Sequence, residues 1–376
     1  MNERLNIAML GHKYIPSREG GIEVVVGELS TRLVEEGCSV TCYNRFNDRV
    51  QSKKTDVEIE SEYKGVRLKI VPTIRRKGLA AVTSSFFATV YAAFGNYEVV
   101  HIHAEGMAAF CWLPRLFGKK VIVTVHGLDW QRAKWKRGIA SKYIHFGEKV
   151  AVKYAHEIIV LSRNTQKYFE AVYNRKTHFI PNGVSRPKNA DAKLIKEKFD
   201  LEKDSYILYL GRLVPEKGEH YLIEAFKKLK TNKKLVIAGG ASDSDEYEKK
   251  LKKMALEDKR IIFTSFVKGR LLAELYSNAY VYCLPSDLEG MPLSLLEAMS
   301  YGNCCVVSNI NECVEVVEDK AIIFEKGNIE ALTEILSKLI EDKEKVEMYR
   351  KDIADFICNK YNWENVIKKT LDLYKN

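Results

Sequence analysis

The sequence predicts an α/β protein of two Rossmann-like, doubly wound domains that face each other across a cleft. Three observations lead to this fold class. Short, continuous apolar runs alternate with helical patterns, this series occurs twice, and the chain of 376 residues suits two domains of ordinary size. Uninterrupted apolar runs of this kind are typical of parallel strands that are buried on both faces.

In the first half, six apolar runs predict strands, and the pattern of residues 24–36 predicts a helix after the first of them. These runs are residues 5–10, 38–43, 66–71, 99–103, 121–125 and 158–161. The most apolar stretch, residues 79–94, is shorter than the about 20 residues that span a bilayer. Hydroxyl side chains also interrupt it, so we expect a buried helix.

The second half repeats this plan, with helical patterns at residues 221–230 and 291–301. Its expected strands are residues 206–210, 235–238, 261–264, 280–284, 304–308 and 321–324. Proline, asparagine and glycine punctuate residues 181–189, which indicates the hinge. We therefore expect domains at residues 1–185 and 190–358, with a last helix within residues 362–376 that packs back on the first domain.

Composition indicates which partners and which cell compartment to expect for the protein. The net charge of +10 suggests an anionic partner, which could be a nucleic acid, a phosphorylated substrate or a membrane. The eight cysteines contain no C-x-x-C pair and show no zinc spacing, so we expect reduced thiols and no metal site. The first residues lack the pattern of a targeting segment, and we expect a cytoplasmic protein.

The first candidate motif follows the first expected strand, where Gly20 and Gly21 precede a helix. Ligands of open α/β sheets bind beyond the carboxyl ends of strands. Glycines at a helix start let backbone N–H groups approach an anion. The alternative is a plain glycine-rich turn. G-x-G-x-x-G is absent, which argues against a standard dinucleotide site.

A second motif occupies the same place in the second half, where Arg212 and Lys217 follow residues 206–210. The two cations can converge on a diphosphate, for which arginine supplies a planar fork and lysine a point charge. The alternative is a pair of solvated loop cations.

The third motif begins with Glu289 and Gly290 and leads into a helix that contains Glu297. Pro292 suits the first helical turn, because its missing N–H has no partner there in any case. The N–H groups of Leu293 and Ser294 would point at a ligand above the helix start. Two carboxylates at this place suit sugar hydroxyls. Alternatively, Glu289 only stabilises the helix start and Glu297 faces solvent.

Glu289 and Glu297, separated by seven residues, resemble the E-x7-E signature of retaining glycosyltransferase family 4, which has the GT-B fold. The Gly-Arg-Leu…Glu-Lys-Gly run, the early Gly-Gly pair and Ile-Pro-Asn-Gly-Val at residues 180–184 occur in the order that this family shows. The resemblance covers essentially the whole chain. Residues 11–23 and 124–130 further resemble a branch that includes bacterial rhamnosyltransferases of surface polysaccharide assembly.

The resemblance implies roles for the donor-side residues. It places the donor diphosphate on Arg212 and Lys217, the ribose on Glu297 and the donor sugar on Glu289. It also places Gly20, Gly21 and Val267 beside the donor, and the helix start adds Gly290, Leu293 and Ser294 to the expected donor-binding residues. The chain departs from the family's usual Gly-Phe-Gly after the first glutamate, where it has Gly-Met-Pro, so contacts at that edge are expected to differ.

Three residues of the first domain complete the candidate site. The resemblance favours contact of His126 with the donor sugar near the reacting carbon, while the alternative is a structural, hydrogen-bonded histidine. His103 and Glu105 are expected to line the cleft on the acceptor side. We expect the side chains of His101 and His103 to lie on opposite faces of their strand, and hence no metal site.

A basic stretch with aromatic residues covers residues 130–149, including Lys134, Lys136 and Arg137. This composition suits an anionic membrane surface, but it also fits a solvated helix whose aromatic side chains face the core. The sequence contains no recognised nucleic-acid motif, so we expect no nucleic-acid partner.

We therefore expect a metal-independent, retaining glycosyltransferase of bacterial cell-surface polysaccharide synthesis that uses no cofactor. Its partners would be a nucleotide-sugar donor, a saccharide or lipid-linked acceptor and an anionic membrane surface. Two alternatives are a nucleotide-sugar epimerase on the same fold, which turns over its donor without an acceptor, and a non-catalytic basic binding protein.

Overall fold

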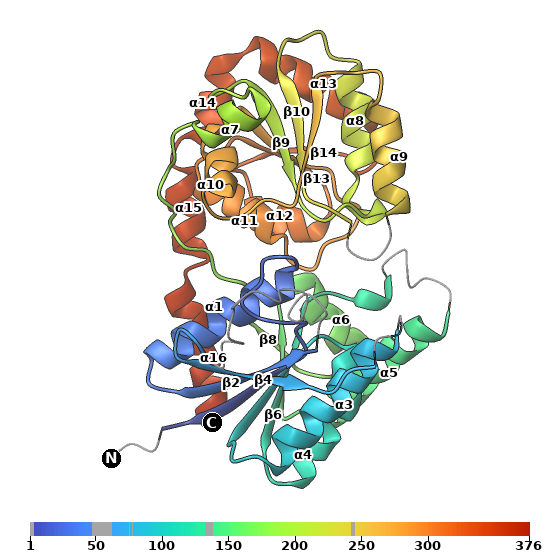
Figure 1. Ribbon diagram of the computed structural model, residues 1–376, viewed down its shortest axis with the longest axis vertical. Coiled ribbons are helices and arrows are strands. Elements are labelled where there is room, and N and C mark those ends of the chain that lie inside the picture. Colours follow the sequence, from blue (N-terminus) through green and yellow to red (C-terminus); the bar gives the residue numbers. More distant parts are fainter. Residues whose placement is uncertain (1–3, 47–61, 75, 77, 132–137, 242–244) are drawn as a thin grey trace, which may run out of the picture. The chain divides into compact units, whose positions relative to one another are not determined.

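The computed structural model describes residues 4–46, 62–74, 76, 78–131, 138–241 and 245–376. The chain forms two compact units, one of residues 1–181 with 364–376 and one of residues 182–363. Each unit holds one largely parallel sheet with helices on both faces (Figure 1). The predicted fold class, two Rossmann-like α/β domains, is confirmed. No helix in the described part of the chain is long and apolar enough to cross a bilayer.

The sheet of the first unit has the strand order β3-β4-β2-β1-β5-β6-β7-β8, and only the β3–β4 pair is antiparallel. Its strands are β1 (Asn6–Leu10), β2 (Ser39–Arg45), β3 (Glu62–Tyr63), β4 (Val66–Val71), β5 (Val99–His103), β6 (Lys120–Val125), β7 (Glu157–Val160) and β8 (His178–Phe179). In the central strand, Ala8 pairs with Thr41 on one side and Val100 on the other. All three are buried, as expected for a strand that is covered on both faces.

Helices and short 3-10 turns connect these strands. They are α1 (Gly21–Glu35), α3 (Leu79–Phe94), η1 (Gly106–Phe110), α4 (Trp112–Leu116), η2 (Asp129–Gln131), α5 (Ile139–Tyr154) and α6 (Arg163–Tyr173). The last helix of the chain, α16 (Trp363–Lys375), returns to this unit. There the Tyr374 hydroxyl lies 2.6 Å from Nδ1 of His101 on β5.

The expected helix at residues 79–94 is present as α3, but the expectation that it is buried holds for one face alone. Several large side chains of α3 lie largely in solvent, with Phe86 44% and Phe94 68% exposed, while Phe87 packs against the core. The face against the sheet carries alanine and hydroxyl residues, among them Ser85 and Ala88. The overall apolarity of a helix does not show which of its faces packs against the sheet. The composition of α3 therefore did not predict that several of its large side chains are exposed.

The sheet of the second unit is entirely parallel, in the order β11-β10-β9-β12-β13-β14. Its strands are β9 (Tyr206–Leu210), β10 (Lys234–Ala238), β11 (Ile261–Ser265), β12 (Val281–Leu284), β13 (Cys305–Ser308) and β14 (Ile322–Phe324). Its helices are α7 (Leu194–Phe199), η4 (Pro215–Lys217), α8 (Glu219–Lys227), α9 (Glu246–Ala255), α10 (Gly269–Asn278), α11 (Leu293–Ser300), α12 (Asn311–Val317), α13 (Ile329–Glu341), α14 (Lys343–Arg350) and α15 (Ile353–Lys360).

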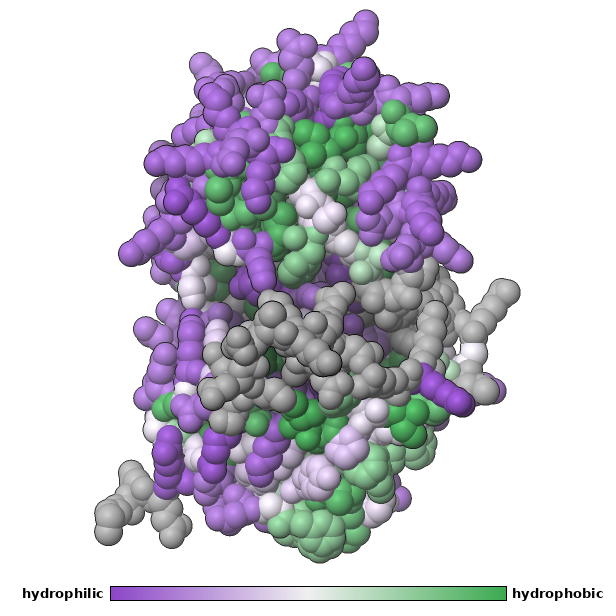
Figure 2. All heavy atoms as spheres, in the orientation of Figure 1, coloured by the Kyte–Doolittle hydropathy of each residue, from purple (hydrophilic) through white to green (hydrophobic). Residues whose placement is uncertain are grey.

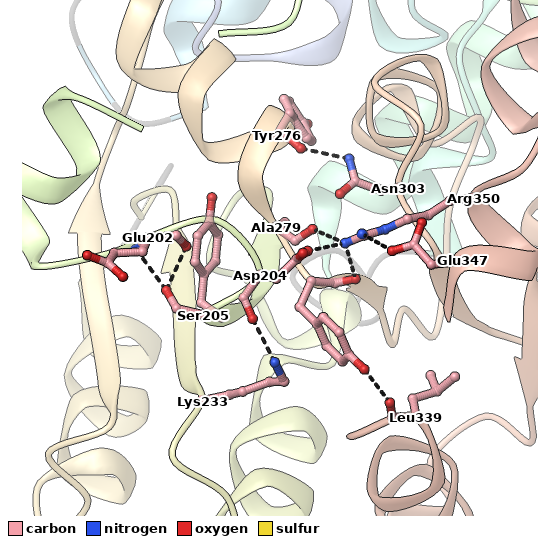
Figure 3. A network of polar contacts seen from close by, with 12 residues as sticks. Glu202, Asp204, Ser205, Lys233, Tyr276, Ala279, Asn303, Leu339, Glu347 and Arg350 are labelled. Carbon is pink, nitrogen blue, oxygen red and sulfur yellow. Dashed lines mark hydrogen bonds and ion pairs between the residues drawn. The ribbon is translucent and has the colours of Figure 1, made fainter. Parts of the chain in front are cut away.

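A polar network fastens this unit at the amino ends of β9 and β12 (Figure 3). The guanidinium of Arg350 donates to Asp204 at 2.6 Å and to the carbonyl oxygens of Ala279 and Tyr280 at 2.8 and 3.0 Å. Lys233 donates to the backbone carbonyl of Asp204 at 2.6 Å. The network joins α14 to the residues that precede β9 and β12. The candidate site lies at the opposite, carboxyl edge of the sheet.

All eight cysteines are free thiols, and all except Cys358 are buried. Burial raises the pKa of Cys42 to about 12, so this side chain behaves as a small hydrophobic residue.

Candidate active site

Two candidate residues of the second unit form an ion pair beyond the carboxyl ends of β9 and β12. The Lys217 ammonium lies 2.5 and 2.6 Å from the two carboxylate oxygens of Glu289. The side chains are 15% and 5% exposed. Ser286 donates a further hydrogen bond of 2.8 Å to Glu289. The carboxylate is therefore fixed on two sides, and the sequence motifs of Lys217 and Glu289 form one cluster.

The backbone holds the two loops of this cluster together. Gly218, with φ of +72°, follows Lys217, and a Cβ atom at Gly218 would lie 2.0 Å from the carbonyl oxygen of Pro285. The N–H of Asp287 donates to the carbonyl of Glu216 at 2.8 Å. Only glycine permits both this left-handed conformation and this close approach, so Gly218 sets the position of Lys217 against the β12 loop.

Arg212 follows β9 at the same edge. Its backbone carbonyl accepts a hydrogen bond of 3.2 Å from the Tyr209 hydroxyl, which fixes the loop. The half-buried side chain makes no hydrogen bond or ion pair with any described residue. The guanidinium is thus available to an anionic ligand, in contrast with the ammonium of Lys217.

The start of α11 lies beyond β12. Pro292 is the N-cap with extended backbone, and the helix begins at Leu293. The expectation that Pro292 lies within the first turn is off by one residue, because its carbonyl already accepts from Leu295 and Leu296. The first N–H groups of α11, those of Leu293 and Ser294, have no intrahelical acceptor at this position and can serve a ligand.

Tyrosines of the second unit support α11. Tyr282 on β12 donates to the hydroxyl of Ser294 at 2.8 Å, and Tyr276 on α10 donates to Glu297 at 3.1 Å. The half-buried Glu297 is therefore held by a tyrosine rather than facing solvent freely. Gly290, half-buried, precedes this helix, and Val267, 7% exposed, follows β11 at the same edge of the sheet.

In the first unit, Gly20 is the N-cap of α1 and Gly21 its first residue. This helix start already carries a carboxylate. Glu23 accepts the N–H of Lys13 at 2.8 Å, and its other oxygen would lie 2.1 Å from a Cβ atom at Gly20. A negative side chain thus partly neutralises the positive end of the helix.

Histidines gather at the carboxyl ends of β1, β5 and β6. Nδ1 of His103 lies 3.0 Å from Nε2 of His126, and Nε2 of His12 lies 2.9 Å from Oδ1 of Asn44. Desolvation lowers the pKa of His12 to about 4 and that of His103 well below its usual range. Nε2 of His103 is buried and has no hydrogen-bond partner among the described residues. His126, half-buried, is held by a neutral histidine.

The expectation that His101 and His103 lie on opposite faces of β5 is wrong. Their rings stack with centroids 4.2 Å apart. Residues two apart in a strand point to the same face, so the strand period itself requires this arrangement. The described residues nevertheless contain no group of three or more histidine, cysteine, aspartate or glutamate side chains that could hold a metal ion.

Glu105 lies 1% exposed after β5 and accepts the N–H of Asp129 at 3.0 Å. Burial, followed by the neighbouring Asp129 and a hydrogen bond with Glu148, raises the pKa of Glu105 well above its usual range. Glu148 also accepts from the Trp130 indole at 3.2 Å. Glu105 is therefore buried support for the loop after β6, rather than an open part of a cleft lining.

The predicted cationic residues Lys134, Lys136 and Arg137 lie outside the described residues. Of the aromatic residues near them, Trp130 is half-buried against His145. Among the aromatic residues of this stretch that the structure describes, only Phe146, which is 55% exposed, is largely in solvent.

Sequence reasoning missed several supporting residues. Ser286 and Tyr276 contact the two motif glutamates from positions 3 and 21 residues away. His12 and Glu148 organise the first unit. Ser286 and His12 each lie two residues after the end of a strand. This position at the carboxyl edge of a sheet could have marked them as candidate site residues. Tyr276 and Glu148 lie within helices, where nothing local marks them.

Two family models match the chain. Residues 19–186 match the model described as glycosyltransferase family 4, and residues 191–355 match the model described as glycosyl transferases group 1. Together the two matched segments cover most of both units.

Individual proteins are similar over much of the chain. A UDP-Gal:α-D-GlcNAc-diphosphoundecaprenol α-1,3-galactosyltransferase of Escherichia coli is 28% identical, over 82% of this chain and 84% of its own length. Sucrose-phosphate synthase of Thermosynechococcus elongatus has a TM-score of 0.85 at 21% identity, covering 99% and 98% of the two chains. The Anabaena protein HepE in complex with UDP-glucose has a TM-score of 0.80 at 15% identity, covering 98% and 99%. These structural likenesses show a shared GT-B fold.

Proposed function

Because this chain belongs to the glycosyltransferases of the family 4 type, we propose that it transfers a sugar from a nucleotide-diphosphate donor to a saccharide or lipid-linked acceptor, with retention of anomeric configuration. The setting would be the synthesis of a bacterial cell-surface polysaccharide. The observation that carries the proposal is the Lys217–Glu289 ion pair at the carboxyl edge of one parallel sheet, where Arg212 and Glu297 follow the paired strands β9 and β12.

The charges of this edge suit the leaving group. Negative charge grows on the β-phosphate of the donor as the glycosidic bond breaks. Arg212, Lys217 and the first N–H groups of α11 can stabilise that charge without a metal ion. Glu289 and Glu297 supply hydrogen-bond acceptors for hydroxyl groups, which we assign to the donor sugar and the ribose respectively.

The first unit would take the acceptor. His126 is our candidate for contact with the donor sugar, with His103 behind it at 3.0 Å. Burial keeps His103 neutral, so it can orient the ring of His126 by one hydrogen bond without adding charge. Attack from the face that the leaving phosphate vacates, with that phosphate accepting the acceptor proton, would retain the configuration.

The similar Escherichia coli enzyme is named for a UDP-galactose donor and a lipid-diphosphate-linked acceptor. The Anabaena structure contains UDP-glucose. These names support a nucleotide-sugar donor and motivate a lipid-linked acceptor for this chain. The resemblance to rhamnosyltransferases adds dTDP-rhamnose to the donors that should be tested.

A thermal-shift screen with UDP-, GDP- and dTDP-sugars tests the proposal, because a ligand that binds only the folded state raises the melting temperature. One nucleotide class should stabilise the protein, and its sugar should then appear on a polyprenyl-diphosphate saccharide with the same anomeric configuration by NMR. If no nucleotide shifts the melting temperature and no transfer occurs, the proposal fails. Conversion of the donor without an acceptor would instead indicate an epimerase.

A further inference from the structure

Helix α3 has the reverse of the usual arrangement of a surface helix. Its buried positions carry only small or hydroxyl residues, namely Ser84, Ser85, Ala88, Thr89, Ala92 and Ala93. Of its large apolar residues, Leu79, Phe86, Tyr91 and Phe94 are 44–68% exposed, and only Phe87 packs against the core cluster of this unit. The hydrophobic effect acting on this unit alone would place large side chains inside and small ones outside. The outward residues of α3 therefore suit a partner.

The exposed side chains of α4 continue this surface. Trp112 is 38%, Leu116 73% and Phe117 46% exposed. The rings of Phe94 and Phe117 lie 4.4 Å apart, which joins the two helices into one aromatic and aliphatic area, here called the α3–α4 face. Figure 2 shows hydrophobic residues gathered over these helices. Contiguous exposed apolar area of this kind marks an interaction site.

The two sequence segments that contain α3 and α4 carry charges of one sign. Residues 64–97 and 106–128, which contain both helices, include no aspartate or glutamate. They include nine lysines and arginines: Lys64, Arg67, Lys69, Arg75, Arg76, Lys77, Arg115, Lys119 and Lys120. An apolar surface whose own segments carry cations and no carboxylates is complementary to anionic lipid.

A groove of about 710 Å³ adjoins this face, between β2, β4 and the end of α3. Tyr91 and Phe94 belong to both the groove and the α3–α4 face. The exposed side chains of Arg67 and Lys69 enter the lining, and no carboxylate residue does. Lys69 lies 5.9 Å from the centroid of the Tyr43 ring. An anionic headgroup in the groove would meet these two cations while its acyl chains lie against the aromatic side chains.

We propose that the α3–α4 face docks on an anionic membrane, with the adjoining groove receiving a lipid headgroup. A second copy of the chain is a poorer occupant, because a two-fold contact would bring the same cations against one another. The proposal concerns binding alone, so it is independent of which sugar the enzyme transfers. It assigns the contact to α3 and α4 rather than to the basic stretch at residues 130–149.

Vesicle flotation tests the proposal with phosphatidylcholine vesicles that contain or lack phosphatidylglycerol. The wild type should bind only the anionic vesicles, and salt should weaken the binding. Two double variants should each reduce binding by about tenfold or more. One is Phe94→Ser with Phe117→Ser, and the other is Lys69→Glu with Arg76→Glu. Matched controls are Leu256→Ser with Met348→Ser, at residues 80% and 61% exposed, and Lys249→Glu with Lys253→Glu. These controls should bind as the wild type does.

Tryptophan fluorescence then separates the two surfaces. Brominated lipids should quench the wild type, and Trp112→Phe should lose most of this quenching while Trp130→Phe keeps it. The proposal is overturned by any of three results. These are equal binding to neutral and anionic vesicles, undiminished binding of the α3–α4 variants, or loss of quenching in Trp130→Phe instead. Sedimentation that shows a dimer dissolved by Phe94→Ser, with vesicle binding unchanged, would assign the face to a second copy.

Discussion

The ammonium of Lys217 contacts both carboxylate oxygens of Glu289, at 2.5 and 2.6 Å, in one ion pair. Our proposal gives these residues different targets, the diphosphate and the donor sugar. A diphosphate that reaches Lys217 must therefore share the ammonium with Glu289 or displace it. Binding of a diphosphate that displaces Glu289 from Lys217 would release the Glu289 carboxylate, which could then contact the donor sugar.

Glu289→Gln should separate nucleotide binding from sugar transfer. Without the carboxylate, Lys217 is fully available, so UDP or the cognate nucleotide should bind at least as tightly as to the wild type. Transfer should fall by about tenfold or more, since a charged hydrogen bond is worth about 1.5–3 kcal/mol. Calorimetry with the nucleotide and a transfer assay measure the two effects. Lys217→Met should instead weaken the nucleotide, and equal weakening in both variants would contradict the assignment.

Arg212→Ala should weaken the binding of UDP and of inorganic diphosphate alike, by about 1.5–3 kcal/mol for a charged hydrogen bond. The free energy of unfolding should remain close to that of the wild type, because the guanidinium forms no hydrogen bond or ion pair with a described residue. Calorimetry and urea unfolding measure both quantities, with the exposed Lys249→Ala as the control. Unchanged affinity for diphosphate would remove Arg212 from the site.

Glu297→Gln should discriminate between nucleotide and diphosphate. If Glu297 accepts the ribose hydroxyls, the variant loses affinity for UDP but keeps its affinity for inorganic diphosphate, which has no ribose. Tyr276→Phe, which removes the 3.1 Å hydrogen bond to Glu297, should show a smaller loss of the same kind. A variant that binds UDP normally would make Glu297 a structural residue of α11.

Removal of metal ions should leave most of the transfer activity, because Arg212, Lys217 and the start of α11 supply the positive charge that the leaving group needs. Assays with and without EDTA, followed by addition of Mg²⁺ or Mn²⁺, test this. Activity that disappears with EDTA and returns with either ion would contradict the charge argument.

The fold class was predictable because its signals are local. A continuous apolar run predicts the buried strand β9, and a helical pattern of apolar residues predicts the helix α11. The Lys217–Glu289 pair was not predictable, since it joins two loops 72 residues apart through the geometry of a sheet. For α3 a usable signal existed. The small residues Ser84, Ala88 and Ala92 recur at four-residue spacing and mark the face that packs.

The last prediction concerns pH and the buried imidazole of His101. Its ring lies 2.6 Å from both the Tyr374 and the Thr124 hydroxyls. Burial lowers its pKa to about 3 from an ordinary value of 6.5. Below about pH 6.5 the unfolded chain therefore binds a proton at His101 that the folded protein does not bind. The contribution of His101 to the free energy of unfolding is thus complete above that pH and is lost as the pH falls.

His101→Gln removes this titration, so the stability advantage of the wild type should be constant near neutral pH and should shrink by up to about 1.4 kcal/mol per pH unit below about pH 6. Urea unfolding of both proteins at several pH values between about 7.5 and 5 measures the difference. Other buried histidines, such as His12, titrate in both proteins, and the subtraction largely removes their contribution. A wild-type advantage that stays constant down to about pH 5 would mean that the ring of His101 is not held neutral by its burial.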